Sequence, residues 1–226
     1  MRAGLKLQGC NAKKSYPQID VSQLPEGVIR QGAAELSQSD DIIDRNTARQ
    51  LAQGNVKTHY YDELTKPADG DAKLRGWGLD PSVYIVYLHP VTGDEMVVQK
   101  NSEGSLNVKS GNHLFIKRSV SLSRAKEILV HETNHAINPA VASNADTLGR
   151  YKTEFRAYWV AEFRSVSDLD ERARLVREQI LREYPIIKSD YDSKPDVKTA
   201  IDSYTRPEGD LTNLGTLTPE GGTPTK

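Results

Sequence analysis

His131 and His135 lie four residues apart in the stretch LVHETNHAIN, with Glu132 directly after the first of them. Residues four apart on a helix lie on nearly the same face, one turn above the other. Two imidazoles at this spacing can bind one metal ion through ring nitrogens at about 2.0–2.1 Å. Glu132 is then placed to reach a water on that metal and to take its proton. The stretch therefore predicts a metal site with a general base beside it.

This pattern is rare for a chain with only five histidines. A shuffled chain of the same composition would contain it about 0.007 times. The alternative interpretation is an ordinary helix that carries polar histidines on its surface. Ile128 and Leu129 share a broad face with the motif, which disfavours a surface role and indicates that the motif faces the core.

A helix must hold these residues in register. It is expected to begin near Ser121 or Ser123, either of which can cap the first free amides, and to end at Asn138, because Pro139 disfavours helical geometry in the residue before it. Further helices are expected at residues 37–55, 151–166 and 168–184, from their apolar spacing.

The middle of the chain is expected to form a sheet. VYIVYLHP (residues 83–90) and EMVVQK (residues 95–100) flank a turn at Gly93, which predicts a β-hairpin. Residues 113–122 predict a third strand, while residues 69–71 and 76–78 are expected to be turns. The fold class is therefore predicted to be α+β, with a small antiparallel or mixed sheet followed by the motif helix and further helices.

The motif and Glu154 together resemble the gluzincin branch of the zincin metallopeptidases. Glu154 lies 19 residues after His135, similar to the spacing at which a glutamate on the following helix completes the zinc site in that branch. The resemblance covers about residues 80–166. It implies Zn²⁺ bound by His131, His135 and Glu154 in a zincin-like metallopeptidase domain over residues 37–206.

The sequence departs from that branch at one position and leaves some roles open. Tyr158 stands where an acid often follows the third ligand by four residues, so the carboxylate that orients a zinc-bound histidine is unassigned. Asp146 is an alternative third ligand, as in the zincins that use aspartate. Tyr158 is the preferred donor to the oxyanion of the reaction, and Tyr151 and His113 are the other candidates.

The resemblance implies a zinc-dependent endopeptidase with Glu132 as its general base and a protein or peptide as its substrate. Zincins commonly bind substrate as an added strand along a sheet edge, and residues 113–120 are expected to neighbour that edge. Two alternatives remain open. One is a zinc-stabilised binding or structural domain with a fourth protein ligand, and the other is a zinc hydrolase that acts on bonds other than peptides.

The remaining composition limits other functions. The 30 Lys and Arg nearly balance the 31 Asp and Glu, so the basic excess expected of a nucleic-acid-binding protein is missing. The single cysteine, Cys10, excludes an intramolecular disulfide and a Cys-rich zinc site. No stretch approaches the roughly 18 apolar residues of a membrane span.

The sequence also gives expectations for the two ends of the chain and for the place where the protein acts. Residues 1–36, which are polar and broken by prolines and glycines, are expected to form a flexible arm, and residues 207–226 a disordered tail. HETNHA followed by EFRAYW is also similar to zincin domains of bacterial effectors and polymorphic toxins. That similarity implies secretion or delivery into a target cell by a signal-independent route, with secretion machinery or an immunity protein as partner. A cytoplasmic peptidase is the alternative.

Overall fold

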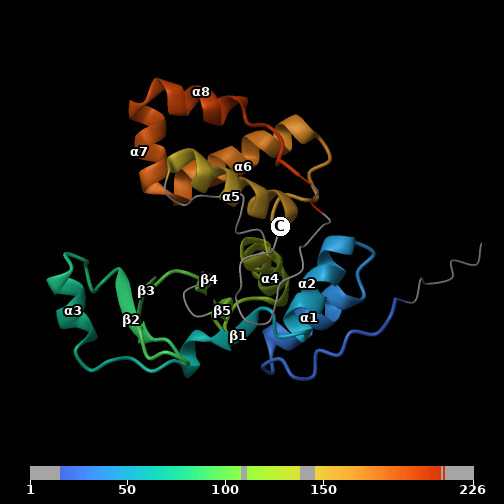
Figure 1. Ribbon diagram of the computed structural model, residues 1–226, viewed down its shortest axis with the longest axis vertical. Coiled ribbons are helices and arrows are strands. Elements are labelled where there is room, and N and C mark those ends of the chain that lie inside the picture. Colours follow the sequence, from blue (N-terminus) through green and yellow to red (C-terminus); the bar gives the residue numbers. More distant parts are fainter. Residues whose placement is uncertain (1–15, 108–110, 138–145, 210, 212–226) are drawn as a thin grey trace, which may run out of the picture.

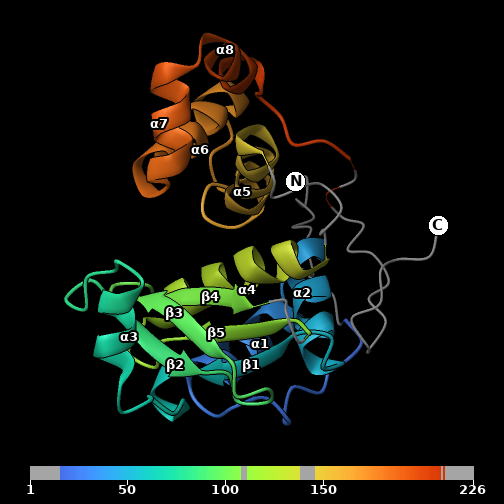
Figure 2. The ribbon, with the colours of Figure 1, turned by 60° about the vertical axis from the view of Figure 1, so that its left-hand side comes forward.

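Helix α4 (Leu122–Ile137), which carries the histidine motif, lies at the centre of the molecule. The computed structural model describes residues 16–107, 111–137, 146–209 and 211. Within them the chain forms eight α-helices and two small sheets, which confirms a mixed α+β fold. Both sheets lie on one side of α4 and the last four helices lie on the other (Figure 1, Figure 2). No helix in the described part of the chain is both long and apolar enough to cross a membrane.

Five short strands form the two sheets. In the first, β1 (Lys57–Tyr60) pairs in parallel with β5 (His113–Ile116), and β5 pairs antiparallel with β4 (Gly104–Asn107). The second is the expected hairpin of β2 (Tyr84–Leu88) and β3 (Glu95–Gln99). Gly93 in its turn has a φ of 73°, a conformation that glycine adopts without steric cost.

The strand at residues 113–122 is shorter than expected from the sequence. β5 ends at Ile116, and the chain then turns into α4, whose Arg124 amide donates to Ser121 Oγ at 3.2 Å. Ser121 therefore caps the motif helix, as predicted, and Asn138 lies outside the described residues. β1 and β4 were not predicted, because four polar-rich residues carry no clear alternating pattern.

Two helices that precede the sheet in the chain pack against each other and against α4. They are α1 (Val28–Ser37) and α2 (Ile42–Ala52). Residues 28–36 were expected to belong to a flexible arm, but they form most of α1, with Ile29, Ala33 and Leu36 buried in the main core. These residues recur at helical spacing, but Gly27 and Gly32 obscure the pattern. Residues 1–15 of the expected arm lie outside the described residues.

The short segments after β1 differ from the expected turns. A 3₁₀ helix, η1 (Tyr61–Glu63), follows β1, and α3 (Gly70–Gly76) includes residues that were expected to form a turn. Gly70 lies against Val86 of β2, where a Cβ would meet the valine side chain at 3.6 Å. α3 therefore packs closely on the hairpin.

The last four helices form the part above α4 (Figure 2). α5 (Thr147–Val160) and α6 (Leu169–Glu183) agree in place with the predicted helices. α7 (Pro185–Ser193) and α8 (Pro195–Ser203) were not predicted, and each begins with a proline, which fits a first helical turn. One apolar core runs from Ile29 through Leu129 to Phe155 and Val176. Most of the expected tail lies outside the described residues.

Candidate metal centre

Helix α4 brings the two motif histidines together. His131 and His135 project from successive turns, and their Nε2 atoms are 3.1 Å apart. His131 is buried, and His135 is partly buried. Leu129 and Ala136 on the same helix belong to the main core, so the motif faces inward, as expected from the sequence.

Helix α5 supplies the third side chain. Glu154 Oε2 lies 3.5 Å from His131 Nε2 and 3.3 Å from His135 Nε2. The alternative residue, Asp146, caps the start of α5, where its carboxylate accepts a hydrogen bond from the Gly149 amide at 2.5 Å. His131, His135 and Glu154 therefore form the group that could hold a metal ion.

The three donor atoms match a tetrahedral site. Metal–ligand distances of about 2.0–2.1 Å correspond to ligand–ligand separations of about 3.3–3.4 Å in a tetrahedron. The observed separations of 3.1, 3.3 and 3.5 Å bracket that value. The atoms thus define one face of a tetrahedron. Two imidazoles and a carboxylate suit Zn²⁺ and also divalent iron, so the geometry fits a divalent metal without selecting one.

The electrostatics favour a positive charge at the centre of this group. Burial alone would raise the pKa of Glu154, but His135 and His131 outweigh burial and hold that pKa well below its usual value. Burial alone would lower the pKa of His131, but Glu162 and Glu154 outweigh it and raise that pKa well above its usual value. The carboxylate is therefore ionised, as a metal ligand must be.

Glu132 lies beside His131 but outside the group of three donors. Burial raises the pKa of its carboxyl, and the nearby His131 and His135 oppose that rise only in part. A raised pKa brings a carboxyl closer to the range in which it exchanges protons near neutral pH. Glu132 therefore holds a proton more readily than a free carboxyl group does.

Glu162, which no sequence pattern indicated, also lies at this group. Its Oε2 lies 3.2 Å from His131 Nδ1, and its Oε1 accepts a hydrogen bond from Arg124 at 3.2 Å. A carboxylate on the second ring nitrogen fixes the orientation of a metal-binding histidine. The residue follows the end of α5, eight positions after Glu154, and no local pattern marks it. It stands where the orienting carboxylate, left unassigned by the sequence, would be expected.

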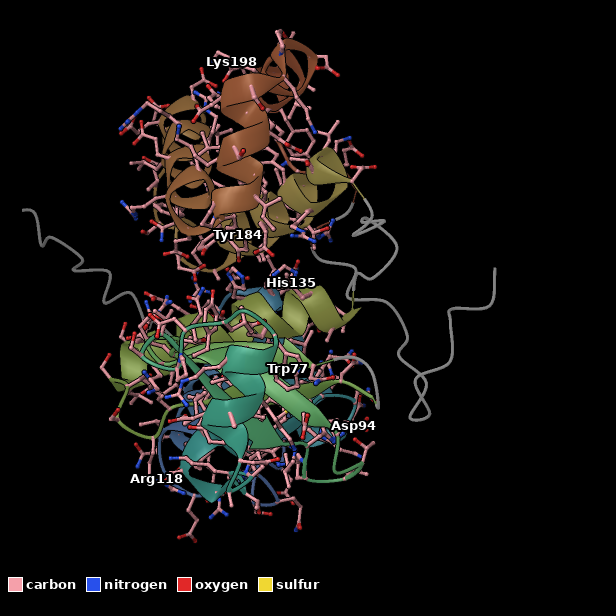
Figure 3. The ribbon with its side chains drawn as sticks, turned by 90° about the vertical axis from the view of Figure 1, so that its left-hand side faces the viewer. Trp77, Asp94, Arg118, His135, Tyr184 and Lys198 are labelled. Atoms are coloured by element: carbon pink, nitrogen blue, oxygen red, sulfur yellow. The ribbon has the colours of Figure 1, made fainter. Side chains whose placement is uncertain are left out.

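Two tyrosines approach the centre from the last four helices. The Tyr184 hydroxyl donates to Glu154 Oε2 at 2.7 Å, and Figure 3 shows Tyr184 facing the part of α4 that carries His135. The Tyr158 hydroxyl donates to Glu183, while its ring lies edge-on to His131 with centroids 4.6 Å apart. Tyr158 thus remains a predicted oxyanion donor with its hydroxyl engaged elsewhere, and Tyr184 is a second candidate that the sequence did not suggest.

The other proposed donors have different neighbours. The Tyr151 ring contacts Phe155 and Tyr204 within the upper helices. His113 contacts His59 and His89 between the two sheets.

Comparisons with known proteins give no relative from which a role for these residues could be transferred. No protein family matches the chain, and neither the curated proteins nor the solved structures include a significant match.

Proposed function

We propose that the protein is a zinc-dependent endopeptidase with a zincin-like arrangement of sheet, motif helix and ligand-bearing helix. One observation carries the proposal: three donor atoms from two helices lie at tetrahedral spacing, with the partly buried Glu132 directly beside them in the sequence. Zinc bound in this way supplies a Lewis acid and a water of lowered pKa.

Each side chain near the metal then has a separate role in the reaction. Glu132 accepts the proton of the attacking water on its carboxylate and delivers it to the leaving amine. Glu162 holds His131 in orientation through Nδ1. The hydroxyls of Tyr184 and Tyr158 are the candidate donors to the oxyanion that forms on the scissile carbonyl.

The position of β4 supports a peptide as the substrate. Among the described strands β4 is an edge of its sheet, with β5 as its neighbour. Gly104 of β4 approaches α4 so closely that a Cβ would meet Ile128 at 2.3 Å. Glu132 is one turn beyond Ile128 and shares its helix face. An extended peptide added to β4 would therefore run past the general base.

The number of protein ligands favours an enzyme over a structural metal domain. Structural zinc sites are usually closed by four protein ligands, whereas catalytic sites use three. The group found among the described residues has three. A zinc hydrolase acting on another bond would use the same residues, so a panel of peptide, ester and amide substrates separates these two activities.

The test combines metal content with cleavage of an unselective peptide library. The wild-type protein is expected to bind about one zinc per chain, and His135→Ala and Glu154→Ala to lose it while keeping their circular dichroism. Glu132→Gln is expected to keep zinc and lose cleavage at least 100-fold. Glu178→Gln, an exposed carboxylate on α6, is the matched control. Wild-type cleavage by Glu132→Gln would disprove the proposal.

The setting follows from the resemblance to effector and toxin domains. We infer that the protein acts in a target cell that it reaches by a signal-independent route, with an immunity protein as its natural inhibitor. Expression of the wild-type chain in bacterial cytoplasm is then expected to arrest growth, and expression of Glu132→Gln is not. Equal growth of the two strains would contradict this inference and would leave the peptidase proposal intact.

A further inference from the structure

The three histidines outside the motif form a second cluster. His59 of β1 and His113 of β5 stack with centroids 5.1 Å apart, and His59 Nε2 lies 2.9 Å from His113 Nδ1. His89, directly after β2, meets His113 edge-on with centroids 4.5 Å apart. His89 and His113 are buried and His59 is partly buried. These three residues, the histidine cluster, come from segments far apart in the sequence.

The contacts limit which rings can take a second proton. In the His59–His113 pair one nitrogen donates and the other accepts, so the accepting ring must be neutral, and a second proton on it would put two N–H groups face to face. His89 Nδ1 accepts hydrogen bonds from the amides of Val91 and Thr92, both at 3.3 Å. Its proton is therefore on Nε2, and a second proton on Nδ1 would face two N–H donors. Protonation thus breaks contacts that hold His89 and its turn in place.

The cluster joins two parts of the lower half of the molecule. α3 packs on β2, and β2 pairs with β3, so residues 70–99 form one unit, called here the hairpin unit. A small apolar cluster, separate from the main core, holds this unit against the three-stranded sheet; its buried members are Tyr61, Leu64, Tyr87, Met96 and Phe115. Apart from this small apolar cluster, the contact of His89 with His113 joins the hairpin unit to the three-stranded sheet, so the histidines contribute to the attachment of the unit.

We propose that the histidine cluster is an acid-sensitive contact whose protonation releases the hairpin unit from the three-stranded sheet. If two neighbouring rings of the cluster, such as His89 and His113 at 4.5 Å between centroids, are both protonated, their positive charges repel each other where little water can screen them. Release exposes the rings to water, where each takes up a proton freely. The proposal concerns residues outside the metal centre and does not depend on the proposed function.

The charges around His59 decide the sign of the effect. Burial lowers the pKa of His59 and His89 lowers it further, while Glu63 opposes them and Lys57 adds a smaller lowering effect; the resulting pKa lies below its usual value. Glu63 is exposed and paired with Arg118. A histidine whose folded pKa is depressed binds fewer protons when folded, so acid favours release. The release equilibrium is expected to shift about tenfold per pH unit for each proton taken up, below the ordinary histidine pKa of about 6.5.

Hydrogen exchange of the full chain, followed by mass spectrometry, tests the proposal. Labelling at pH 7.5 and pH 5.5, with times scaled to the intrinsic exchange rate, compares peptides of the hairpin unit with peptides of α1 and α6. At pH 5.5 the hairpin unit is expected to lose protection at least fivefold more than α1 and α6. Equal change in all these peptides would overturn the proposal.

Two variants locate the cause. His59→Gln keeps a nitrogen near the position of Nε2, and His89→Asn keeps an acceptor for the amides of Val91 and Thr92. The side chains of Gln and Asn do not titrate between pH 5.5 and pH 7.5. The double variant is expected to lose the selective response to acid. Asp192→Asn, at an exposed carboxylate of α7 away from both histidine groups, is the control and is expected to keep it. A response that persists in the double variant would overturn the proposal.

A wild-type measurement covers the case in which the double variant does not fold. Exchange of the histidine C2 hydrogen reports the protonation of each ring in the native protein. His59 is expected to titrate below its ordinary range, and titration at or above that range would overturn the proposal.

Discussion

Glu162 and Glu132 both lie next to His131, yet they should affect different properties of the protein. Glu162 contacts Nδ1 and orients the ring, so Glu162→Gln is expected to weaken metal binding about 10–100-fold with the fold intact. Competition with a chromophoric chelator measures this loss. Glu132→Gln, which removes no metal ligand, is expected to keep wild-type affinity in the same assay. Equal affinities of the Glu162→Gln and wild-type proteins would exclude an orienting role for Glu162.

The two tyrosines can be separated by removing one oxygen at a time. Tyr184 donates to the ligand Glu154, whereas Tyr158 donates to Glu183. If Tyr184 is the oxyanion donor, Tyr184→Phe is expected to lower kcat about 100-fold with little change in KM, and Tyr158→Phe to lower it much less. Tyr191→Phe, whose hydroxyl contacts Asp202 in the upper helices, is the control. The reverse order of the two effects would restore Tyr158 as the donor.

The approach of β4 to α4 makes a prediction at the scale of elements. Gly104→Ala would place a Cβ 2.3 Å from Ile128 Cγ2, so the strand or the helix must shift. The free energy of unfolding in urea is expected to fall by about 1–3 kcal/mol. Ile128→Ala makes room for that Cβ, so the double variant should lose less stability than the sum of the single variants. If the losses of stability in the single variants add exactly in the double variant, the contact between β4 and α4 at this point does not limit the size of the residue at position 104.

Metal binding should join the two halves of the molecule. Two ligands come from α4 and the third from α5 in the upper part, so a bound ion ties these parts together. At 100 times the dissociation constant, binding adds about 2.7 kcal/mol to stability, and removal by a chelator is expected to lower Tm by about 5–10 °C. His135→Ala serves as the control and should show no response to the chelator.

Metal binding is also expected to release protons. The carboxylates of Glu162 and Glu154 raise the pKa of His131 well above its usual value despite burial, so in the metal-free protein this ring holds its second proton more strongly than a free imidazole does. A metal must displace that proton, and affinity should therefore rise with pH. Calorimetry in two buffers of different ionisation enthalpy measures the released protons. A binding enthalpy independent of the buffer would contradict the expectation.

Local sequence patterns were sufficient where a structure depends on neighbours along the chain. The motif helix, its cap at Ser121 and the hairpin around Gly93 follow from helical spacing, capping chemistry and turn preference, and all three are present. The motif itself predicted a metal group. α1 shows the limit of this approach, because its apolar spacing is visible in the sequence but two glycines disguise it.

What the amino-acid sequence determined by itself is the pair of histidines on one helix face, with a glutamate between them, because that geometry depends on helical rise alone. The tertiary structure decided the rest. It places Glu154 rather than Asp146 with the two histidines. The Asp146 side chain caps the start of α5, and Glu154, farther along the same helix, lies against His135 of α4. The tertiary structure also brought Glu162 and Tyr184 to the centre and gathered three distant histidines between the sheets. Such contacts depend on how helices and sheets pack against one another, and the spacing of residues along the chain does not determine that packing.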